Sequence, residues 1–176
     1  MELNAEIVKD FVESPRDTAR ETVLKRELRL LPESERFVFI QTCLDFTGYR
    51  IGGLGLLLAT SCLESKTYIL PLLEKGLVAA DASTIKFWLE FAVAKLGERK
   101  TIAILFDKLD TEPDVVGKAL YWLPSLLKAE SKTLEELQRL RTLAEARGVI
   151  CKPVIIPEPN NEERVLFGNF YANGDT

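Results

Sequence analysis

Signals that start and stop helices recur along this chain at a nearly constant interval. Helix pairs are predicted to begin near residues 1, 33, 65 and 98, with a further half-pair near 131. Pro32 closes one predicted helix and opens the next, whereas Gly97 and Gly148 end two others. A step of about 32 or 33 residues is typical of a solenoid, in which each helix pair buries its apolar face against the next pair.

The composition agrees with a helical chain. Of the 176 residues, 47% are hydrophobic and 28 are leucine, whereas proline and glycine number 8 and 10. This balance favours helices over sheets. Breaks between helices are predicted near residues 14, 32, 47, 64, 80, 97, 111 and 131, and the first helix takes its apolar stripe from Leu3 to Val12. The fifth helix, roughly 66–76, is expected to end at Gly76.

Periodicity also predicts which side chains form the core. Leu89 and Leu120 lie in the apolar stripes of the sixth and eighth predicted helices, and both are expected to be fully buried. Trp88 belongs to the same stripe as Leu89 and is assigned to the core. Small residues share one side of the fourth helix, where they would let a neighbouring helix approach closely. These residues are Gly52, Gly55, Ala59 and Cys62.

One unit carries a resemblance to a known class of repeat. The helix 101–109 is followed by the turn sequence Asp110-Thr111-Glu112-Pro113, and then by a second apolar helix that contains Val115 and Leu120. This order of first helix, acidic-proline turn and second helix resembles that of HEAT and armadillo-like repeats, with the best match in residues 98–128. Pro71, inside the fifth helix, is similar to the proline of HEAT first helices. The resemblance implies an all-α fold, a short α-solenoid that forms a HEAT-like superhelix of about four helix pairs.

The end of the chain changes character. Residues 149–157 are rich in β-branched side chains and interrupted by proline, and 165–171 form a second apolar run. This pattern predicts extended chain in both segments. We therefore predict a helical repeat domain over 1–148 and an extended or hairpin C-terminal appendage over 149–176.

Several kinds of chemistry are disfavoured by what the sequence lacks. There is no histidine, so Ser-His-Asp and Cys-His catalysis and His-ligated metal sites are excluded. The three cysteines, Cys43, Cys62 and Cys151, form no CxxC pair and are interpreted as small buried hydrophobes in a reducing compartment. We expect no catalytic residue, no cofactor and no metal.

The charge and the longest apolar run bear on partners and location. A net charge of −4 argues against a protein that coats nucleic acid. The longest uncharged apolar run, residues 51–63, is shorter than the roughly 20 residues of a membrane span. The N-terminal residues also lack the pattern of a secretory signal. A cytoplasmic protein with a protein partner and without a membrane span is the expectation.

The candidate partner surface lies on the eighth predicted helix, roughly 112–129. Its apolar residues share one face, and polar residues with a tyrosine share the other, at which the spacing of Asp114 and Lys118 allows an ion pair. A tyrosine among charges suits a protein contact. The polar seam of the sixth helix completes the set. The candidate residues are Asp114, Lys118, Tyr121, Trp122, Ser125, Lys86 and Glu90.

These features favour a non-catalytic scaffold or adaptor for protein–protein interaction. Two alternatives remain open from the sequence. One is a DNA-base-modifying enzyme built on a HEAT-like fold, which would use aromatic residues and a carboxylate such as Asp114 on a basic concave face. The other is a compact helical regulator that binds and neutralises one partner.

Overall fold

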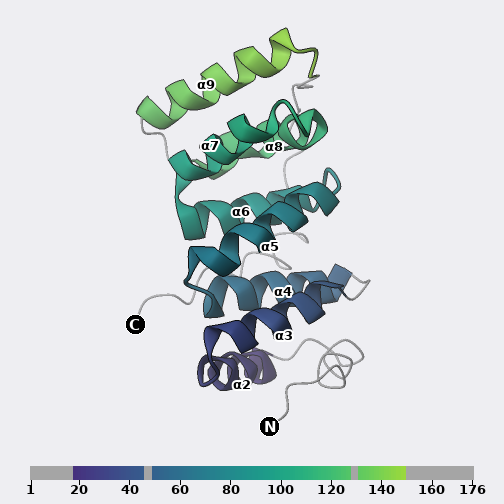
Figure 1. Ribbon diagram of the computed structural model, residues 1–176, viewed down its shortest axis with the longest axis vertical. Helices are drawn as coiled ribbons and strands as arrows, with labels where there is room; N and C mark the ends of the chain where they lie inside the picture. Colours follow the sequence, from purple (N-terminus) through teal and green to yellow (C-terminus); the bar gives the residue numbers. More distant parts are fainter. Residues whose placement is uncertain (1–17, 46–48, 128–130, 150–176) are drawn as a thin grey trace.

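The fold is all-α throughout the residues that the structure describes. The computed structural model describes residues 18–45, 49–127 and 131–149, and these stretches contain eight helices and no strand (Figure 1). None of these helices is long and apolar enough to cross a membrane. Their bounds are Thr18–Arg29 for α2, Glu33–Asp45 for α3, Tyr49–Cys62 for α4, Lys66–Ala79 for α5, Ile85–Leu96 for α6, Glu98–Lys108 for α7, Pro113–Leu126 for α8 and Ser131–Ala146 for α9.

The observed helix boundaries confirm the predicted breaks near residues 32, 64, 80, 97, 111 and 131. Pro32 precedes α3, Gly97 separates α6 from α7, and Pro113 opens α8. Pro71 lies inside α5, as predicted. The predicted first helix, the breaks near residues 14 and 47, and the appendage beyond Val149 lie outside the described residues.

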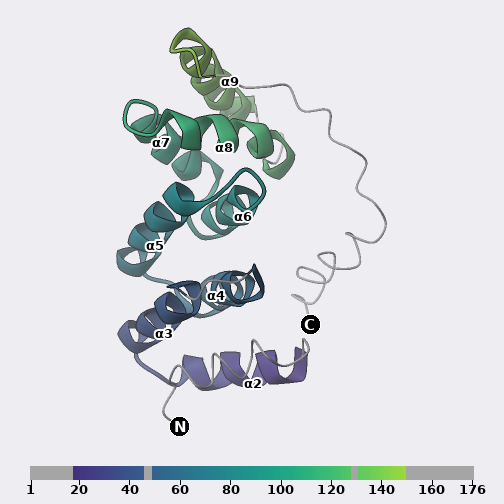
Figure 2. The same cartoon turned by 90° about the vertical axis from the view of Figure 1, so that its right-hand side faces the viewer.

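The helices are stacked in two layers. The even-numbered helices pack in series, α2 on α4, α4 on α6 and α6 on α8, whereas α3 packs on α5 and α7 on α9. Across the layers, α3 packs on α4, α5 on α6, α6 on α7 and α7 on α8. Figure 2 shows α3, α5 and α7 along one side of the stack and α4, α6 and α8 along the other. Because each helix packs mainly on helices one or two places away in the chain, the described residues form a short α-solenoid rather than a bundle wrapped around one closed core.

The core follows the predicted apolar stripes. Leu89 and Leu120 are 0% and 1% exposed, which confirms their predicted burial. Helix α6 is buried on two sides because it packs against α4, α5, α7 and α8, and Phe91 adds a second buried face to that of Ile85 and Leu89. The middle of the stack therefore contains a helix that packs on both layers.

The small residues of α4 allow close helix packing, as predicted. A Cβ atom built on Gly55 would lie 2.7 Å from two side-chain carbons of Leu44 on α3, which is closer than real Cβ atoms approach other atoms. Ala59 and Cys62 are also buried. The missing side chain at residue 55 thus lets Leu44 lie directly against the backbone of α4.

Gly76 does not end the fifth helix, and that prediction was wrong. Helix α5 continues for one further turn to Ala79, and its last N–H bond runs from Ala80 to the carbonyl of Gly76. The ring of Trp88 on α6 lies 2.3 Å from the position that a Cβ on Gly76 would occupy. Trp88 itself is half-buried and packs edge-on against Phe91. The glycine at position 76 is explained by the ring of Trp88, which occupies the place of a side chain, and not by the end of the helix.

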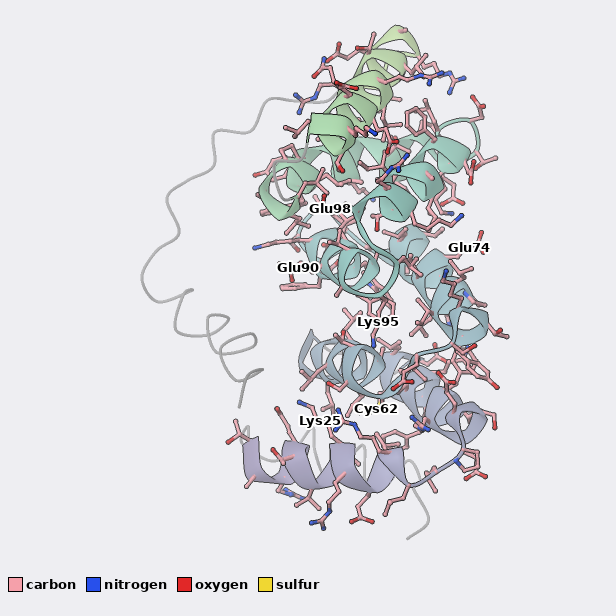
Figure 3. All side chains as sticks on the ribbon, turned by 90° about the vertical axis from the view of Figure 1, so that its left-hand side faces the viewer. Lys25, Cys62, Glu74, Glu90, Lys95 and Glu98 are labelled. Carbon is pink, nitrogen blue, oxygen red and sulfur yellow. The ribbon has the colours of Figure 1, made fainter. Side chains whose placement is uncertain are left out.

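Cations from three helices cap the C-terminal end of α4. The last carbonyls of a helix have no partner within the helix and carry partial negative charge, so cationic donors stabilise them. Figure 3 shows Lys95 and Lys25 approaching from α6 and α2 toward the end of α4, where Cys62 lies. The three bonds run from Arg29 to the carbonyl of Ser61 (3.1 Å), from Arg36 to that of Cys62 (2.8 Å) and from Lys95 to that of Leu63 (2.7 Å).

A carboxylate holds the start of the next helix. The side chain of Glu33 accepts the backbone N–H groups of Glu64 and Ser65 at 2.6 and 2.8 Å. Ser65 is the N-cap of α5. Hydrogen bonds from Ser65 and then Glu64 hold the pKa of Glu33 below its ordinary value, because they stabilise the ionised form. The turn between α4 and α5 is therefore fixed by charged side chains of neighbouring helices.

This arrangement predicts a pH-dependent stability. Since the pKa of Glu33 is lower in the folded state, its contribution is present above the unfolded pKa and is lost as the pH falls through the folded value. We expect Glu33→Gln to lower the melting temperature at pH 7. We also expect the melting temperature of this variant to fall less than that of the wild type between pH 7 and pH 3. Thermal melts followed by circular dichroism measure both effects. The exposed Glu35, changed to glutamine, is the control. Identical pH profiles for the two variants would contradict the assigned role.

Candidate partner surface on α6 and α8

The predicted surface residues of α8 differ in how far they face solvent. Asp114 and Ser125 are exposed, whereas Lys118, Tyr121 and Trp122 are half-buried. The opposite face of the helix is buried as expected, through Val115, Val116, Ala119, Leu120 and Leu123. The division of α8 into an apolar and a polar-aromatic face is thus confirmed.

Packing of α8 on α6 joins residues that are far apart in the sequence. The ammonium of Lys86 lies 5.2 Å from the ring centroid of Trp122, within the range of a cation–π interaction. Lys86 also approaches Glu90 one turn later, at 3.9 Å. Tyr121 meets Trp122 edge to face, with the ring centroids 4.6 Å apart. These four residues, Lys86, Glu90, Tyr121 and Trp122, form one cluster, which we call the α6–α8 aromatic surface.

Two of the candidate residues anchor a loop. Lys118 donates to the carbonyl of Ala80 at 3.0 Å, and the indole N–H of Trp122 donates to that of Ala82 at 2.8 Å. The sequence spacing allows Lys118 to pair with Asp114, whereas in the structure the ammonium caps the C-terminal end of α5. Lys118 is therefore a structural residue, and its replacement would disturb the loop between α5 and α6.

The same loop is held from within by Asp81. One of its carboxylate oxygens accepts the backbone N–H of Thr84 at 2.7 Å and the hydroxyl and N–H of Ser83 at 2.7 and 2.9 Å. These bonds, that of the Thr84 N–H first, hold the pKa of Asp81 well below its ordinary value. Because the indole N–H of Trp122 donates to a carbonyl of this loop, the fixed loop also holds the edge of the Trp122 ring in place.

Asp114 and Ser125 lie outside the cluster of touching side chains. Asp114 lies two helical turns before Tyr121, and the hydroxyl of Ser125 donates to the backbone carbonyl of Trp122 at 2.7 Å. Sequence reasoning also missed the carbonyls of Ala80 and Ala82, which are 38 and 40 residues away from their partners. No local pattern in the sequence points to such bonds.

The described residues offer little for other chemistry. Within them, no group of three or more histidine, cysteine, aspartate or glutamate residues is arranged to hold a metal ion. Cys43 and Cys62 are buried free thiols, as predicted, and Cys151 lies outside the described residues. Burial raises the pKa of Cys43 to about 12 and also raises that of Cys62. Thiols of this kind are poor nucleophiles, because the reactive form is the thiolate.

Comparisons with known proteins give no guide to identity. No protein-family model, no curated protein and no solved structure matches this chain.

Proposed function

We propose that this protein is a non-catalytic scaffold or adaptor for protein–protein interaction, built as a HEAT or armadillo-like repeat, and that its partner binds the α6–α8 aromatic surface. The observation that supports the proposal is the cluster of Tyr121, Trp122 and Lys86, which is half-buried yet still open to solvent. Tyrosine, tryptophan and cations near them are the residues that most often contribute large shares of binding free energy.

The cluster is suited to binding because it loses little conformational freedom on association. Trp122 is held by its bond to Ala82, and Tyr121 is held against Trp122. Aromatic side chains that are fixed beforehand cost less entropy when a partner covers them. The tyrosine presents an apolar ring and a polar hydroxyl, so it can both exclude water and donate a hydrogen bond.

The test is partner capture with a double variant. Tyr121→Ala together with Lys86→Ala should reduce partner affinity by about thirtyfold or more, which corresponds to roughly 2 kcal/mol for a favoured anchor residue. Lys118 is left unchanged because it holds Ala80. The measurement is affinity capture from the source cell, followed by mass spectrometry, with wild-type and variant bait.

The matched control removes exposed side chains elsewhere. Gln138 and Arg139 are exposed on α9, and their replacement by alanine should leave capture unchanged. Circular dichroism shows whether each variant is folded. Equal capture of the same proteins by the wild type and by the Tyr121→Ala, Lys86→Ala variant would remove this surface from the interface.

A further inference from the structure

The chain leaves its last helix in the direction of α8. Gly148 follows α9 with φ +74°, a left-handed conformation that favours glycine. The N–H of Val149 then bonds back to the carbonyl of Ala144 at 2.9 Å. The side chain of Val149 is half-buried, and its Cγ1 lies 3.1 Å from where a Cβ on Gly117 of α8 would be. The last described residue therefore rests on α8.

The site at which Val149 contacts α8 lies next to the α6–α8 aromatic surface. Gly117 and Tyr121 are one turn apart on the same side of α8, so they are neighbours on the helix surface. Tyr121 in turn contacts Trp122, whose ring lies under Lys86. A chain that continues from Val149 across the outward face of α8 meets these residues in that order.

The residues that follow have suitable chemistry for this path. Ile150, Val154, Ile155 and Ile156 are β-branched apolar residues, and Pro153 and Pro157 fix φ at values that belong to extended chain. The first acidic residue after them is Glu158, and Glu162 and Glu163 follow it. Apolar side chains suit the rings of Tyr121 and Trp122, and a carboxylate suits the ammonium of Lys86.

The segment is also long enough. An extended chain advances about 3.3 Å per residue, so residues 150–158 reach up to roughly 30 Å. The stretch of α8 from Gly117 to Ser125 rises only about 12 Å, and α6 lies beside it at a normal interhelical distance of about 10 Å. Glu158 can therefore reach Lys86 without strain in the chain.

We propose that residues 150–158 bind in cis across the α6–α8 aromatic surface, with the apolar residues on Tyr121 and Trp122 and Glu158 beside Lys86. The tail is then the resident occupant of this surface, and a protein partner must displace it. The competition rests on the proposed function, whereas the docking of the tail does not and is tested without any partner.

Cys151, only two residues after Val149, allows the position of the tail to be tested by disulfide cross-linking. In the full chain, Tyr121→Cys places a thiol next to the proposed path and leaves the ring of Trp122 and the ammonium of Lys86 as docking contacts. Gln138→Cys places one on the exposed face of α9 as the matched control. On mild oxidation with copper phenanthroline, we expect the disulfide with Cys151 to form about tenfold faster in Tyr121→Cys, because docking raises the local thiol concentration. Peptide mapping by mass spectrometry identifies the bond, and the buried Cys43 and Cys62 do not compete.

A second measurement keeps both tyrosine and tail cysteine intact. The two tryptophans give two indole N–H signals in a ¹H–¹⁵N correlation spectrum of the full chain. Ile155→Asp with Ile156→Asp should shift the signal of Trp122 and leave that of Trp88 in place. Asn160→Asp with Asn161→Asp is the matched control for added charge, and it should move neither signal.

The two experiments decide the proposal together. Faster cross-linking at residue 121 and a selective shift of Trp122 support docking of the tail. Equal cross-linking rates at residues 121 and 138, or a Trp122 signal that the Ile155 and Ile156 changes do not move, overturn it. Neither result decides the outcome of the partner-capture test, since that test changes Tyr121 and Lys86 and leaves the tail unchanged.

Discussion

Replacing Leu89 by alanine should lower the free energy of unfolding by about 2–5 kcal/mol, the range for a buried leucine whose loss leaves a cavity. Leu89 is 0% exposed, and α6 packs against helices of both layers. Neighbours on opposite sides cannot all move inward to fill the space. Urea-induced unfolding, followed by circular dichroism, measures the loss.

Exposed leucines provide the control for this change. Leu134 on α9 is 42% exposed, so Leu134→Ala removes the same atoms but opens no internal cavity. Its cost should stay within about 1 kcal/mol. Leu120→Ala, on the buried face of α8, should behave like Leu89→Ala. Similar losses at residues 89 and 134 would contradict the assignment of the core.

Features that depend on neighbouring residues in the sequence could be predicted well. A proline at position 32, a glycine at 97 and the apolar spacing around Leu89 and Leu120 each act within one or two helical turns. Helix boundaries and buried faces follow from such local rules. The layered packing also followed, because a constant step between helix pairs places equivalent helices side by side.

Contacts between distant polar groups could not be predicted in the same way. The partner for Lys118 that is visible in the sequence is Asp114, four residues earlier, because this spacing allows an ion pair on a helix. The stack instead brings the end of α5 beside α8, where the free carbonyl of Ala80 competes for the ammonium. A helix end that lacks a partner within its own helix is a strong acceptor. The cations that cap α4 are explained by the same principle.

The candidate surface could be predicted only in part from the sequence. The local pattern of α8 correctly placed Tyr121 and Trp122 outside the main apolar stripe. Their contact with Lys86 depends on the packing of α6 against α8 and on the bond from Trp122 to Ala82. The sequence could therefore supply the members of the surface, but only the fold shows which of them touch.

Gly76→Ala is the second change for which we expect a large loss of stability. In an open helix, alanine would stabilise by about 1 kcal/mol relative to glycine. Here the added methyl group would overlap the ring of Trp88, whose atoms lie 2.3–2.4 Å from the Cβ position. A rigid ring packed edge-on against Phe91 cannot bend away, so α5 and α6 must separate or Trp88 must leave its site. We expect a net loss of about 1–3 kcal/mol in urea-induced unfolding.

Gly117→Ala isolates the steric part of this loss, because it makes the same substitution in the interior of α8. There the new methyl group would meet only the Cγ1 of Val149, at 3.1 Å, and a side-chain methyl can shift by a few tenths of an ångström. We expect a change within about 1 kcal/mol of zero, as the gain in helix propensity offsets the contact. Trp88 fluorescence, recorded with Trp122→Phe in both backgrounds, should change for Gly76→Ala and not for Gly117→Ala. If Gly76→Ala were as stable as the wild type with unchanged Trp88 emission, Trp88 would not lie against α5, and Gly76 would need another explanation.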